Sequence, residues 1–264
     1  MSHNLQILPN QYLERYIATT NIDWQVVAKL FTKNNSHKAE PHDFDYYIQT
    51  SSVYSSNIEG NSIDPDTWLK NKAFKIKSKP KETAEIDDLI AAYTFATTQP
   101  LTKSNFLQAH LLLSKTILSL KSQRGKLRTQ PVGIYAGGRL EYLAVEPEFV
   151  ETEINKLFDD IDLLIKKELS IAEMLYFSSL IHLIFEKIHP FMDGNGRAGR
   201  LLEKWFLVQK LGIGAWHLET EKYYFKHRAD YYQRIHIGLN YYVLKLEKCL
   251  DFAQMLTECL KQSI

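Results

Sequence analysis

The sequence predicts a mainly α-helical protein with one small β-hairpin. Apolar residues recur at helical spacing through most of the 264 residues, and the run at residues 170–188 carries a buried face. Only residues 123–145 break this rhythm, with two short β-prone runs around a Gly-Gly turn. A hydrophobic content of 45% and a charged content of 24% are ordinary for a globular protein, so a sizeable helical core is expected.

The charge and the cysteines set the expected surroundings. A formal net charge of +1 provides no global field for nucleic acid or an anionic membrane, so neither is an expected partner. No apolar stretch reaches the length of a membrane span, and the N-terminus has no secretory signal pattern. Cys249 and Cys259 lie about 15 Å apart along one predicted helix, too far for a disulfide within it. Two free thiols fit a cytoplasmic protein.

The first hundred residues are expected to form four helices. Residues 1–20 give weak signals and are expected to wrap the surface, and the polar segment Asn34–Asp43 is expected to be a loop. The basic run at residues 75–81 is short and has no interleaved aromatic residues, which favours a solvated connection. The predicted helices are Asp23–Lys33, Asp45–Glu59, Pro65–Lys75 and Glu82–Thr98.

The rest of the chain adds the hairpin and six further helices. Thr102 or Ser104 is a candidate N-cap, and Pro147 followed by acidic residues is typical of a helix start. The hairpin strands are predicted at Val132–Tyr135 and Leu140–Ala144. The predicted helices are Ser104–Leu120, Pro147–Lys167, residues 170–188, the run from about Gly194–Arg197 to Gly212, Lys222–Ile237 and Leu239–Lys261.

The stretch His189–Arg200, reading HPFMDGNGRAGR, concentrates the polar chemistry of the chain. It lies between two predicted buried helices and opens the second of them. The free N–H groups of a helix's first turn and the helix dipole both favour an anion at that place. Gly194 and Gly196 have no side chain to block close approach by a phosphate. The stretch therefore predicts an anion-binding site.

Four other side chains of this stretch suit attack on a nucleotide phosphate. Arg197 and Arg200 share one helix face, and guanidinium groups suit bidentate phosphate contacts. Asp193 offers a hard oxygen ligand for Mg²⁺, and His189 can take a proton near neutral pH. A Gly-Asn-Gly turn or a lone histidine would indicate only a structural role. The complete set in this order favours a catalytic site.

A second informative stretch lies upstream, in the helix Asp45–Glu59. Ser52, Ser55 and Glu59 form a narrow polar stripe along it, and Gly60 follows as a C-terminal cap. Glu59 therefore stands at the carbonyl end, where a helix prefers a cation. A local rule broken in this way often marks a functional partner. The alternative is a solvated glutamate on an ordinary surface helix.

The stretch His189–Arg200 resembles the signature of the Fic family, HPFxDGNGRxxR, at every specified position. The preceding residues HLIFEKI also fit, and the resemblance extends from about Ser51 to Tyr232. It implies an all-helical core, a Fic-type helical bundle, and transfer of AMP from ATP to a protein hydroxyl. By this resemblance His189 is the base, Asp193 binds Mg²⁺, Gly194, Asn195 and Gly196 cradle phosphates, and Arg197 and Arg200 bind the β and γ phosphates.

The segment SSNIEGN resembles the inhibitory motif of Fic proteins, (S/T)xxxE(G/N), with Ser55, Glu59 and Gly60 at the specified positions. Its place upstream of the core resembles the class that carries its inhibitory helix in the same chain. The resemblance implies that Glu59 pairs with Arg200 and blocks the ATP γ-phosphate. It divides the chain into residues 1–100, with an inhibitory helix at about 45–60, and residues 101–264, with the catalytic core and C-terminal helices.

The predicted hairpin has a possible role beside this site. A hairpin with no sheet to join leaves an open edge, which can pair with an extended target segment. Fic proteins have such a flap, so Val132, Gly133, Ile134 and Tyr135 are expected to dock a protein target. A surface hairpin covering the core is the alternative. Tyr231 and Tyr232 resemble the paired tyrosines that many Fic proteins place near the nucleotide base, although core packing explains them equally well.

Other readings of the chemistry stay open. In some Fic relatives the inhibitory glutamate positions a water that removes AMP from a modified protein, and a different nucleoside monophosphate is a further alternative. A non-enzymatic nucleotide-binding regulator is disfavoured because mere binding has no use for His189. The phosphate-transferring Doc branch is disfavoured because it lacks the second glycine, here Gly196. A homodimer is possible, and the sequence names neither target nor modified residue.

Overall fold

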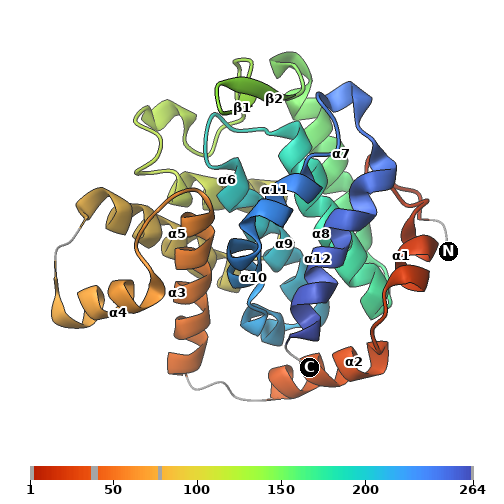
Figure 1. Ribbon diagram of the computed structural model, residues 1–264, viewed down its shortest axis with the longest axis horizontal. Helices are drawn as coiled ribbons and strands as arrows, with labels where there is room; N and C mark the ends of the chain where they lie inside the picture. The colour runs from red at the N-terminus through yellow and green to blue at the C-terminus, as the bar shows by residue number, and fades with distance from the viewer. Residues whose placement is uncertain (1–2, 37–40, 77–78, 263–264) are drawn as a thin grey trace.

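The computed structural model describes residues 3–36, 41–76 and 79–262. This part of the chain is mainly α-helical with a single two-stranded antiparallel sheet, which confirms the predicted fold class (Figure 1). The α-helices are α1 (Leu13–Thr19), α2 (Trp24–Ser36), α3 (Pro41–Ile58), α4 (Pro65–Phe74), α5 (Pro80–Thr98), α6 (Lys103–Leu113), α7 (Pro147–Lys166), α8 (Ile171–Ile188), α9 (Asn195–Leu211), α10 (Thr220–Lys226), α11 (Arg228–Ile235) and α12 (Cys249–Lys261). The strands are β1 (Gly133–Ala136) and β2 (Arg139–Leu143), and short 3₁₀ helices lie at Lys121–Gln123, Ile213–His217, Tyr241–Val243 and Leu246–Lys248.

Helices α8 and α9 form the centre of the molecule. Helix α8 begins with a capping box made by Ser170 and Glu173, and every side chain from Leu175 to Ile188 is buried. A helix that is buried all round needs partners on every side. Helices α1, α2, α7 and α12 pack on α8, while α3, α5, α6 and α7 pack on α9. The loop that joins α8 to α9 is therefore held inside a rigid frame.

The N-terminal segment is tied to this frame. The backbone amides of Gln6, Ile7 and Leu8 donate hydrogen bonds of 2.7 to 3.0 Å to the buried carboxylate of Asp160 in α7. Leu8 and Tyr16 are themselves buried. The prediction that residues 1–20 only wrap the surface is thus wrong, because three amides on one carboxylate dock this segment into the core.

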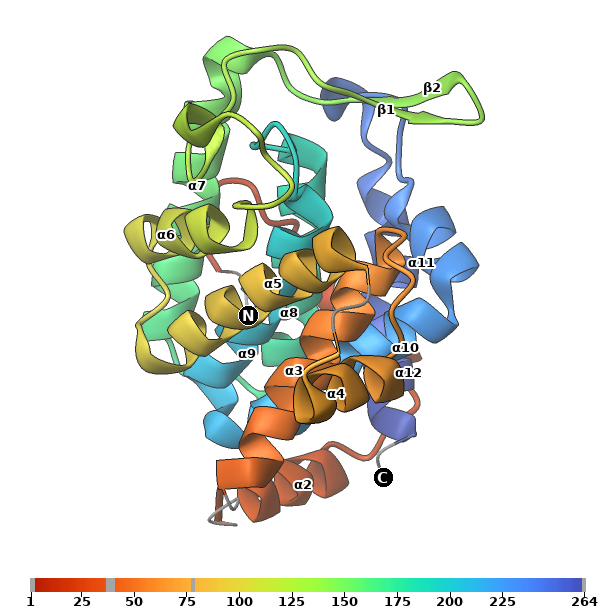
Figure 2. The same ribbon diagram turned by 90° about the vertical axis from the view of Figure 1, so that its left-hand side faces the viewer.

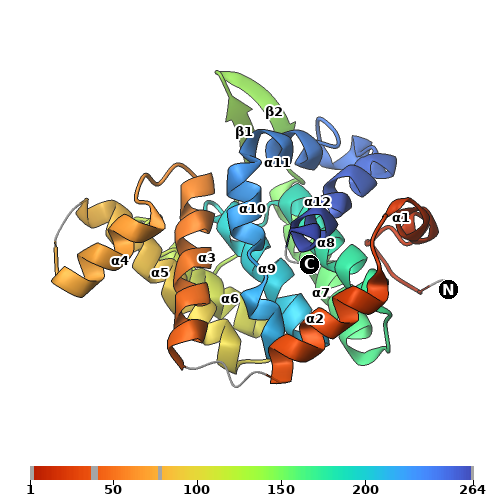
Figure 3. The same cartoon turned by 60° about the horizontal axis from the view of Figure 1, so that its bottom comes forward.

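The hairpin extends beyond the helices, above α11 (Figures 2 and 3). Its strands pair antiparallel with an irregularity between Ile134 and Tyr135. On the outer side of β2, the amide of Leu143 donates a 2.9 Å hydrogen bond to the carbonyl of Leu239. A parallel bridge joins Leu143 to Asn240. The segment near residue 240 thus covers one edge of the hairpin and leaves the β1 edge without a strand partner among the described residues.

Several predicted boundaries differ from the structure. The loop predicted at Asn34–Asp43 is too long, since α2 reaches Ser36 and α3 begins at Pro41, while residues 37–40 lie outside the described residues. The helix predicted to reach Leu120 ends at Leu113, because the amide of Thr116 donates to the carboxylate of Asp88 at 2.7 Å instead of continuing the helix. Thr102, and not Ser104, caps this helix.

The two C-terminal helices were predicted too long. The first is broken at His227 into α10 and α11, where the ring of His227 bonds the carbonyl of Tyr223. The second begins only at Cys249, because residues 237–245 turn back to pair with the hairpin and with themselves. Both cysteines lie in α12, buried and free, as predicted. No helix among the described residues is long and apolar enough to cross a membrane.

Candidate active site

The end of α8 fixes the backbone of His189. This residue adopts the left-handed conformation, with φ of 50°, and its amide closes the helix on the carbonyl of Phe185. The buried guanidinium of Arg128 donates to the carbonyl of His189 at 2.7 Å and also to those of Ile188, Val145 and Gln130. A cation suits the carbonyl end of a helix. Arg128 thereby holds the backbone of the histidine in place.

The loop after His189 is braced from inside. The Asn195 side chain accepts from the amide of Phe191 and donates to its carbonyl, both at 2.9 Å. His110 of α6 stacks on the Phe191 ring, accepts the amide of Gly125 on Nδ1 and contacts the carbonyl of Asp193 with Nε2 at 3.0 Å. Burial lowers the pKa of His110 to about 4, so it is a neutral brace at pH 7. The Asn195 side chain therefore shapes the loop, which leaves its backbone amide for the predicted anion site.

Helix α9 begins where the sequence predicts an anion site. Gly194 has a φ of 81°, a conformation that L side chains rarely adopt, and it turns the chain into the helix. The first-turn amides of Asn195, Gly196 and Arg197 have no acceptor within the helix. Arg197 is buried, and its guanidinium lies 3.5 Å from the carboxylate of Glu85 in α5. One motif arginine is thus already paired with an acidic residue.

The other motif arginine, Arg200, is held by the N-terminal helix α3. Its Nε donates to the hydroxyl of Ser55 and its Nη2 to the carbonyl of Ser55, both at 2.9 Å. Nη2 also forms a 2.8 Å ion pair with Glu59. On the opposite side, Nη1 lies 3.3 Å from the hydroxyl of Tyr231. The guanidinium is only 1% exposed, so these groups compensate nearly all of its lost hydration.

Glu59 lies just after the last residue of α3, and Gly60 follows with a φ of 99°. Its carboxylate is partly exposed, at 31% of the side chain. Burial opposes its ionisation, but the positive charge and hydrogen bond of Arg200 prevail and lower the pKa of Glu59 below its ordinary value. A side chain at position 196 would collide with this carboxylate, so Gly196 permits the approach of Glu59 to α9.

The imidazole of His189 is mostly buried. Its Nδ1 has no hydrogen-bond partner among the residues that the structure describes and lies 3.7 Å from the carboxylate of Glu186, one turn earlier in α8. Burial lowers the pKa of His189 to about 4 and raises that of Glu186. The imidazole is therefore unprotonated at neutral pH and available to accept a proton.

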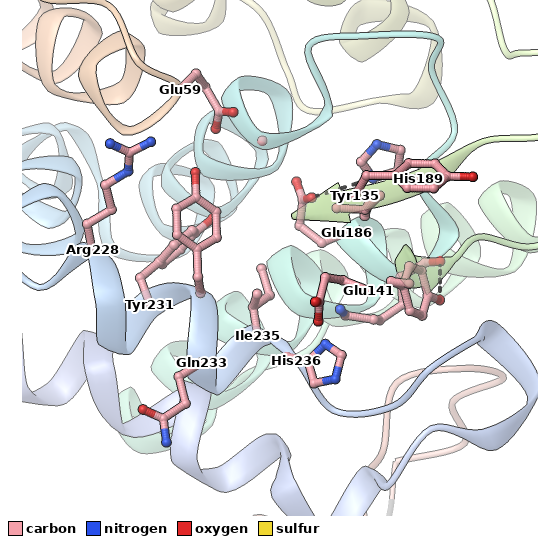
Figure 4. Close-up of a pocket in the computed structure, with 15 residues that line it drawn as sticks. Glu59, Tyr135, Glu141, Glu186, His189, Arg228, Tyr231, Gln233, Ile235 and His236 are labelled. Carbon is pink, nitrogen blue, oxygen red and sulfur yellow. Dashed lines mark hydrogen bonds and ion pairs between the residues drawn. The ribbon is translucent and has the colours of Figure 1, made fainter. Parts of the chain in front are cut away.

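A cavity of about 670 Å³ is lined by Glu59, Gly196, Glu186 and His189, whereas Asp193, Arg197 and Arg200 are not among its lining residues (Figure 4). Glu59 and Arg228 lie at one end, and His189 and Glu186 stand together on the opposite wall, with Glu141 and His236 nearby. Such a volume is typical of a site for a nucleotide-sized ligand. The cavity is lined by Glu59, Ile134, Tyr135, Glu141, Tyr142, Glu186, Lys187, His189, Gly196, Arg228, Tyr231, Tyr232, Gln233, Ile235 and His236.

The two predicted tyrosines both line this cavity, in different ways. Tyr231 is 2% exposed and meets Arg200 through its hydroxyl. Tyr232 is 43% exposed, and its hydroxyl donates to the carbonyl of Ile58 at 3.0 Å. Both hydroxyls are therefore directed to the end of the cavity that Glu59 lines, behind which Arg200 is buried.

The hairpin provides the remaining wall. Ile134 and Tyr135 of β1 line the cavity, and Tyr135 is exposed. Gly133 is the first residue of β1, and Val132 precedes it and accepts the amide of Ala144 through its carbonyl. An extended chain on the free edge of β1 would therefore run beside the cavity that contains His189.

Asp193 stands apart from the other carboxylates. It is exposed, and one of its oxygens accepts the amide of Gly194 at 2.6 Å. No group of three or more metal-ligating side chains occurs among the described residues. A single carboxylate suits Mg²⁺ that takes its other ligands from phosphates and water. The donor set at Asp193 therefore fits a metal that arrives with a nucleotide.

Sequence reasoning missed several residues of the site. Glu85, His110 and Arg128 are distant in sequence, and no local pattern marks them. The Nζ atom of Lys187 lies 4.5 Å from the centre of the Tyr142 ring. Lys187 is 3% exposed, and burial lowers the pKa of its amine to about 8. The adjacent charged residues Glu186 and Lys187 near the end of a mainly apolar helix were the sequence signal available for Lys187.

The chain is similar in sequence and in fold to known proteins. The protein adenylyltransferase fic-1 of Caenorhabditis briggsae is 30% identical over 116 residues, which is 44% of this chain and 20% of that protein. The match thus spans about a fifth of the length of this relative.

Two solved structures share the fold. A Fic family protein from Desulfovibrio desulfuricans G20 aligns with a TM-score of 0.73 and 21% identity, over 99% of this chain and 78% of that chain. A Fic domain-containing signaling protein from Bacteroides thetaiotaomicron VPI-5482 aligns with a TM-score of 0.71 and 19% identity, over 91% of this chain and 93% of that chain. The sequence model of the Fic/DOC family matches residues 100–207, which include α8, the loop and most of α9. Residues 100–207 of this chain are therefore a domain of the Fic/DOC family.

Proposed function

We propose that this protein transfers AMP from ATP to a hydroxyl side chain of a target protein, and that Glu59 keeps this activity low. The observation that carries the proposal is the 2.8 Å pair between Glu59 and Arg200, at one end of a cavity that also holds His189. The Fic/DOC domain and the name of the C. briggsae relative, a protein adenylyltransferase, support the same chemistry.

In the proposed reaction the target hydroxyl oxygen attacks the α-phosphorus of ATP. The bond from that phosphorus to the bridging oxygen breaks, pyrophosphate leaves, and the hydroxyl proton passes to His189. His189 suits this role because its buried imidazole is unprotonated at neutral pH. The amides of Gly194, Asn195 and Gly196 would face the phosphates, and Arg197 and Arg200 would neutralise them.

Asp193 would hold Mg²⁺, which neutralises phosphate charge when bound. The exposed position of Asp193, beside the first turn of α9, is consistent with that role. The protein itself supplies orientation and the base. Its rigid loop, braced by His110 and Asn195, keeps the anion site and His189 in fixed relation.

Glu59 would inhibit by competing with a phosphate for Arg200. A charge-assisted hydrogen bond is worth roughly 1.5–3 kcal/mol, which corresponds to about one to two orders of magnitude in binding. Glu59→Gly should raise AMP transfer by about that factor. Glu59→Gln, which keeps the size of the side chain and removes its charge, should raise transfer in the same direction.

This prediction is tested by incorporation of labelled AMP into protein. The gain from Glu59→Gly should vanish when Arg200→Ala is added, and His189→Ala in the Glu59→Gly background should abolish transfer while leaving ATP binding largely intact. Equal incorporation by wild type and Glu59→Gly would reject the inhibitory role. Parallel reactions with CTP, GTP and UTP would identify the preferred nucleotide.

Removal of AMP from a modified protein is the second candidate. One Glu59 oxygen binds Arg200, and the partly exposed carboxylate lines the cavity, where it could position a water. Incubation of an AMP-labelled protein with wild type and Glu59→Gln separates the two functions. Loss of label with wild type, but not with the variant, would favour hydrolysis.

The hairpin would dock the target by strand addition on β1. The outer side of β2 is already covered near Leu239, so β1 provides the available edge. Ile134→Pro should distort this edge and reduce transfer to protein by at least severalfold, with ATP affinity and melting temperature little changed. Tyr242→Ala, on the covered side, is the control. Unchanged modification of a protein substrate by Ile134→Pro would contradict strand docking.

A further inference from the structure

A buried chain of hydrogen bonds leads away from Arg200 into the core. The hydroxyl of Tyr231 in α11 lies 3.3 Å from Arg200 Nη1 and 3.0 Å from Nε2 of His182 in α8. His182 Nδ1 lies 2.8 Å from the carboxylate of Glu203 in α9. None of these four side chains is more than 2% exposed, so water does not compete for their hydrogen bonds.

The direction of each hydrogen bond follows from the chemistry of its end groups. A guanidinium can only donate, so the oxygen of Tyr231 accepts from Arg200. The Tyr231 hydroxyl hydrogen then has Nε2 of His182 as its acceptor, and His182 donates through Nδ1 to Glu203. The chain thus runs in one direction, from a cation to a buried carboxylate.

The other partners of Arg200 differ in one respect. Ser55 and Glu59, which contact its Nε and Nη2, both belong to the N-terminal segment that ends α3. Tyr231 is the hydrogen-bond partner of Arg200, among the described residues, that lies outside this segment. When Glu59 withdraws and a phosphate takes its place, the contact of Tyr231 with Arg200 does not depend on the position of α3.

We infer that Tyr231, backed by His182 and Glu203, is a positioning residue that keeps Arg200 aimed at the polyphosphate once Glu59 has left. This inference rests on the proposed function. It assigns the hydroxyl of Tyr231 to the arginine and not to the nucleotide base. The contribution of the hydroxyl should therefore be small while Glu59 holds Arg200 and large after Glu59 is removed.

The test compares ligand binding by two proteins, Glu59→Gly and Glu59→Gly with Tyr231→Phe, using calorimetry with ATP and with AMP. Loss of the hydroxyl should weaken ATP binding about tenfold, the scale of a hydrogen bond to a charged group. AMP lacks the β and γ phosphates, so its affinity should not change. Tyr224→Phe is the matched control, because its hydroxyl also bonds Glu203 without contacting Arg200.

Equal ATP affinity in the two proteins would overturn the inference, and so would a parallel loss of ATP and AMP affinity, which indicates a general structural role. If Tyr231→Phe does not fold, His182→Asn tests the same chain, because an asparagine amide replaces Nδ1 and removes the Nε2 acceptor. It should weaken ATP binding selectively as well, and unchanged affinity would again overturn the inference. Failure of Glu59→Gly to transfer AMP would reject the proposed function and leave this binding comparison valid.

Discussion

His189 combines a left-handed backbone with a buried, unprotonated imidazole. Its φ of 50° is imposed by the end of α8 and by Arg128, which holds its carbonyl. This conformation is strained for a residue with a side chain, and such strain persists only where the surroundings impose it. This backbone conformation directs the imidazole into the cavity beside Glu186 (Figure 4).

The protonation state of His189 leads to a prediction about pH. Burial lowers its pKa to about 4, so the base form persists well below the ordinary histidine range. In Glu59→Gly the loss of a nearby negative charge should lower the pKa further. The kcat/KM of AMP transfer by this variant should therefore stay level from pH 8 to about pH 5, since this ratio reports groups of the free enzyme.

The control for this profile is His236→Asn, which removes another cavity histidine and should leave the acid limb in place. An acid limb near pH 6.5 that belongs to His189 would show that its imidazole is not desolvated as the structure indicates. Assay buffers should keep one ionic strength, because phosphate binding depends on salt.

At the scale of elements, two N-terminal helices each contribute one carboxylate to one motif arginine. The end of α3 brings Glu59 to Arg200 at 2.8 Å, and α5 brings Glu85 to Arg197 at 3.5 Å. The second pair is longer, although its carboxylate is less exposed, at 13% against 31% for Glu59. A phosphate that binds Arg197 has to compete with the carboxylate of Glu85, so Glu85 should weaken nucleotide binding. The effect should be smaller than that of Glu59 because the Glu85 pair is longer.

Glu85→Gln in the Glu59→Gly background should therefore lower the Kd for ATP about two- to fivefold, less than the order of magnitude or more expected for the short charge-assisted hydrogen bond of Glu59. Titration calorimetry gives the Kd directly. Asp87→Asn is a matched control on the same helix, because Asp87 pairs with Lys72 near the surface. A Kd equal to that of the control, or higher, would show that Glu85 supports Arg197 and does not compete for it.

The elements that local sequence predicted best are those whose cause is local. Helices α4 and α7 begin at the predicted prolines, and α8 matches its predicted apolar period. The errors arise from tertiary contacts. Asp88 captures the amide that would have lengthened α6, and the hairpin captures the segment before α12.

The same division applies to the site. The residues from His189 to Arg200 are contiguous, so their spacing alone predicted an anion site and a base. Arg128, His110 and His182 support these residues from other elements, and their roles depend on distances that only the folded chain defines. Glu59 attracted attention because its position at a helix end broke an electrostatic rule, but only the resemblance to the Fic inhibitory motif indicated Arg200 as its partner.

At the scale of the whole molecule, the N-terminal hundred residues and the rest share one interior. A single hydrophobic cluster includes Leu8, Tyr16 and Tyr93 together with residues of α8 and α9. The buried carboxylate of Glu221 accepts hydrogen bonds from Ser51 at 3.0 Å and Tyr93 at 2.9 Å, and pairs with Lys204 at 2.9 Å. Release of Glu59 should therefore be a local movement at the end of α3.

This shared interior predicts one cooperative unfolding transition. Removal of residues 1–100 would expose apolar surface of α8 and α9 and would leave Glu221 and Arg200 without their α3 partners. Loss of one partner from a buried charged network typically costs 3–5 kcal/mol, a large part of the stability of a domain.

Calorimetry of the full chain should give a single transition with equal van't Hoff and calorimetric enthalpies. Residues 101–264 alone should give none, whereas Glu59→Gly, which removes one partly exposed partner, should keep the single transition. A cooperative transition in the shortened chain would mean that the N-terminal helices form a separable lid, and that Glu59 can leave with all of α3.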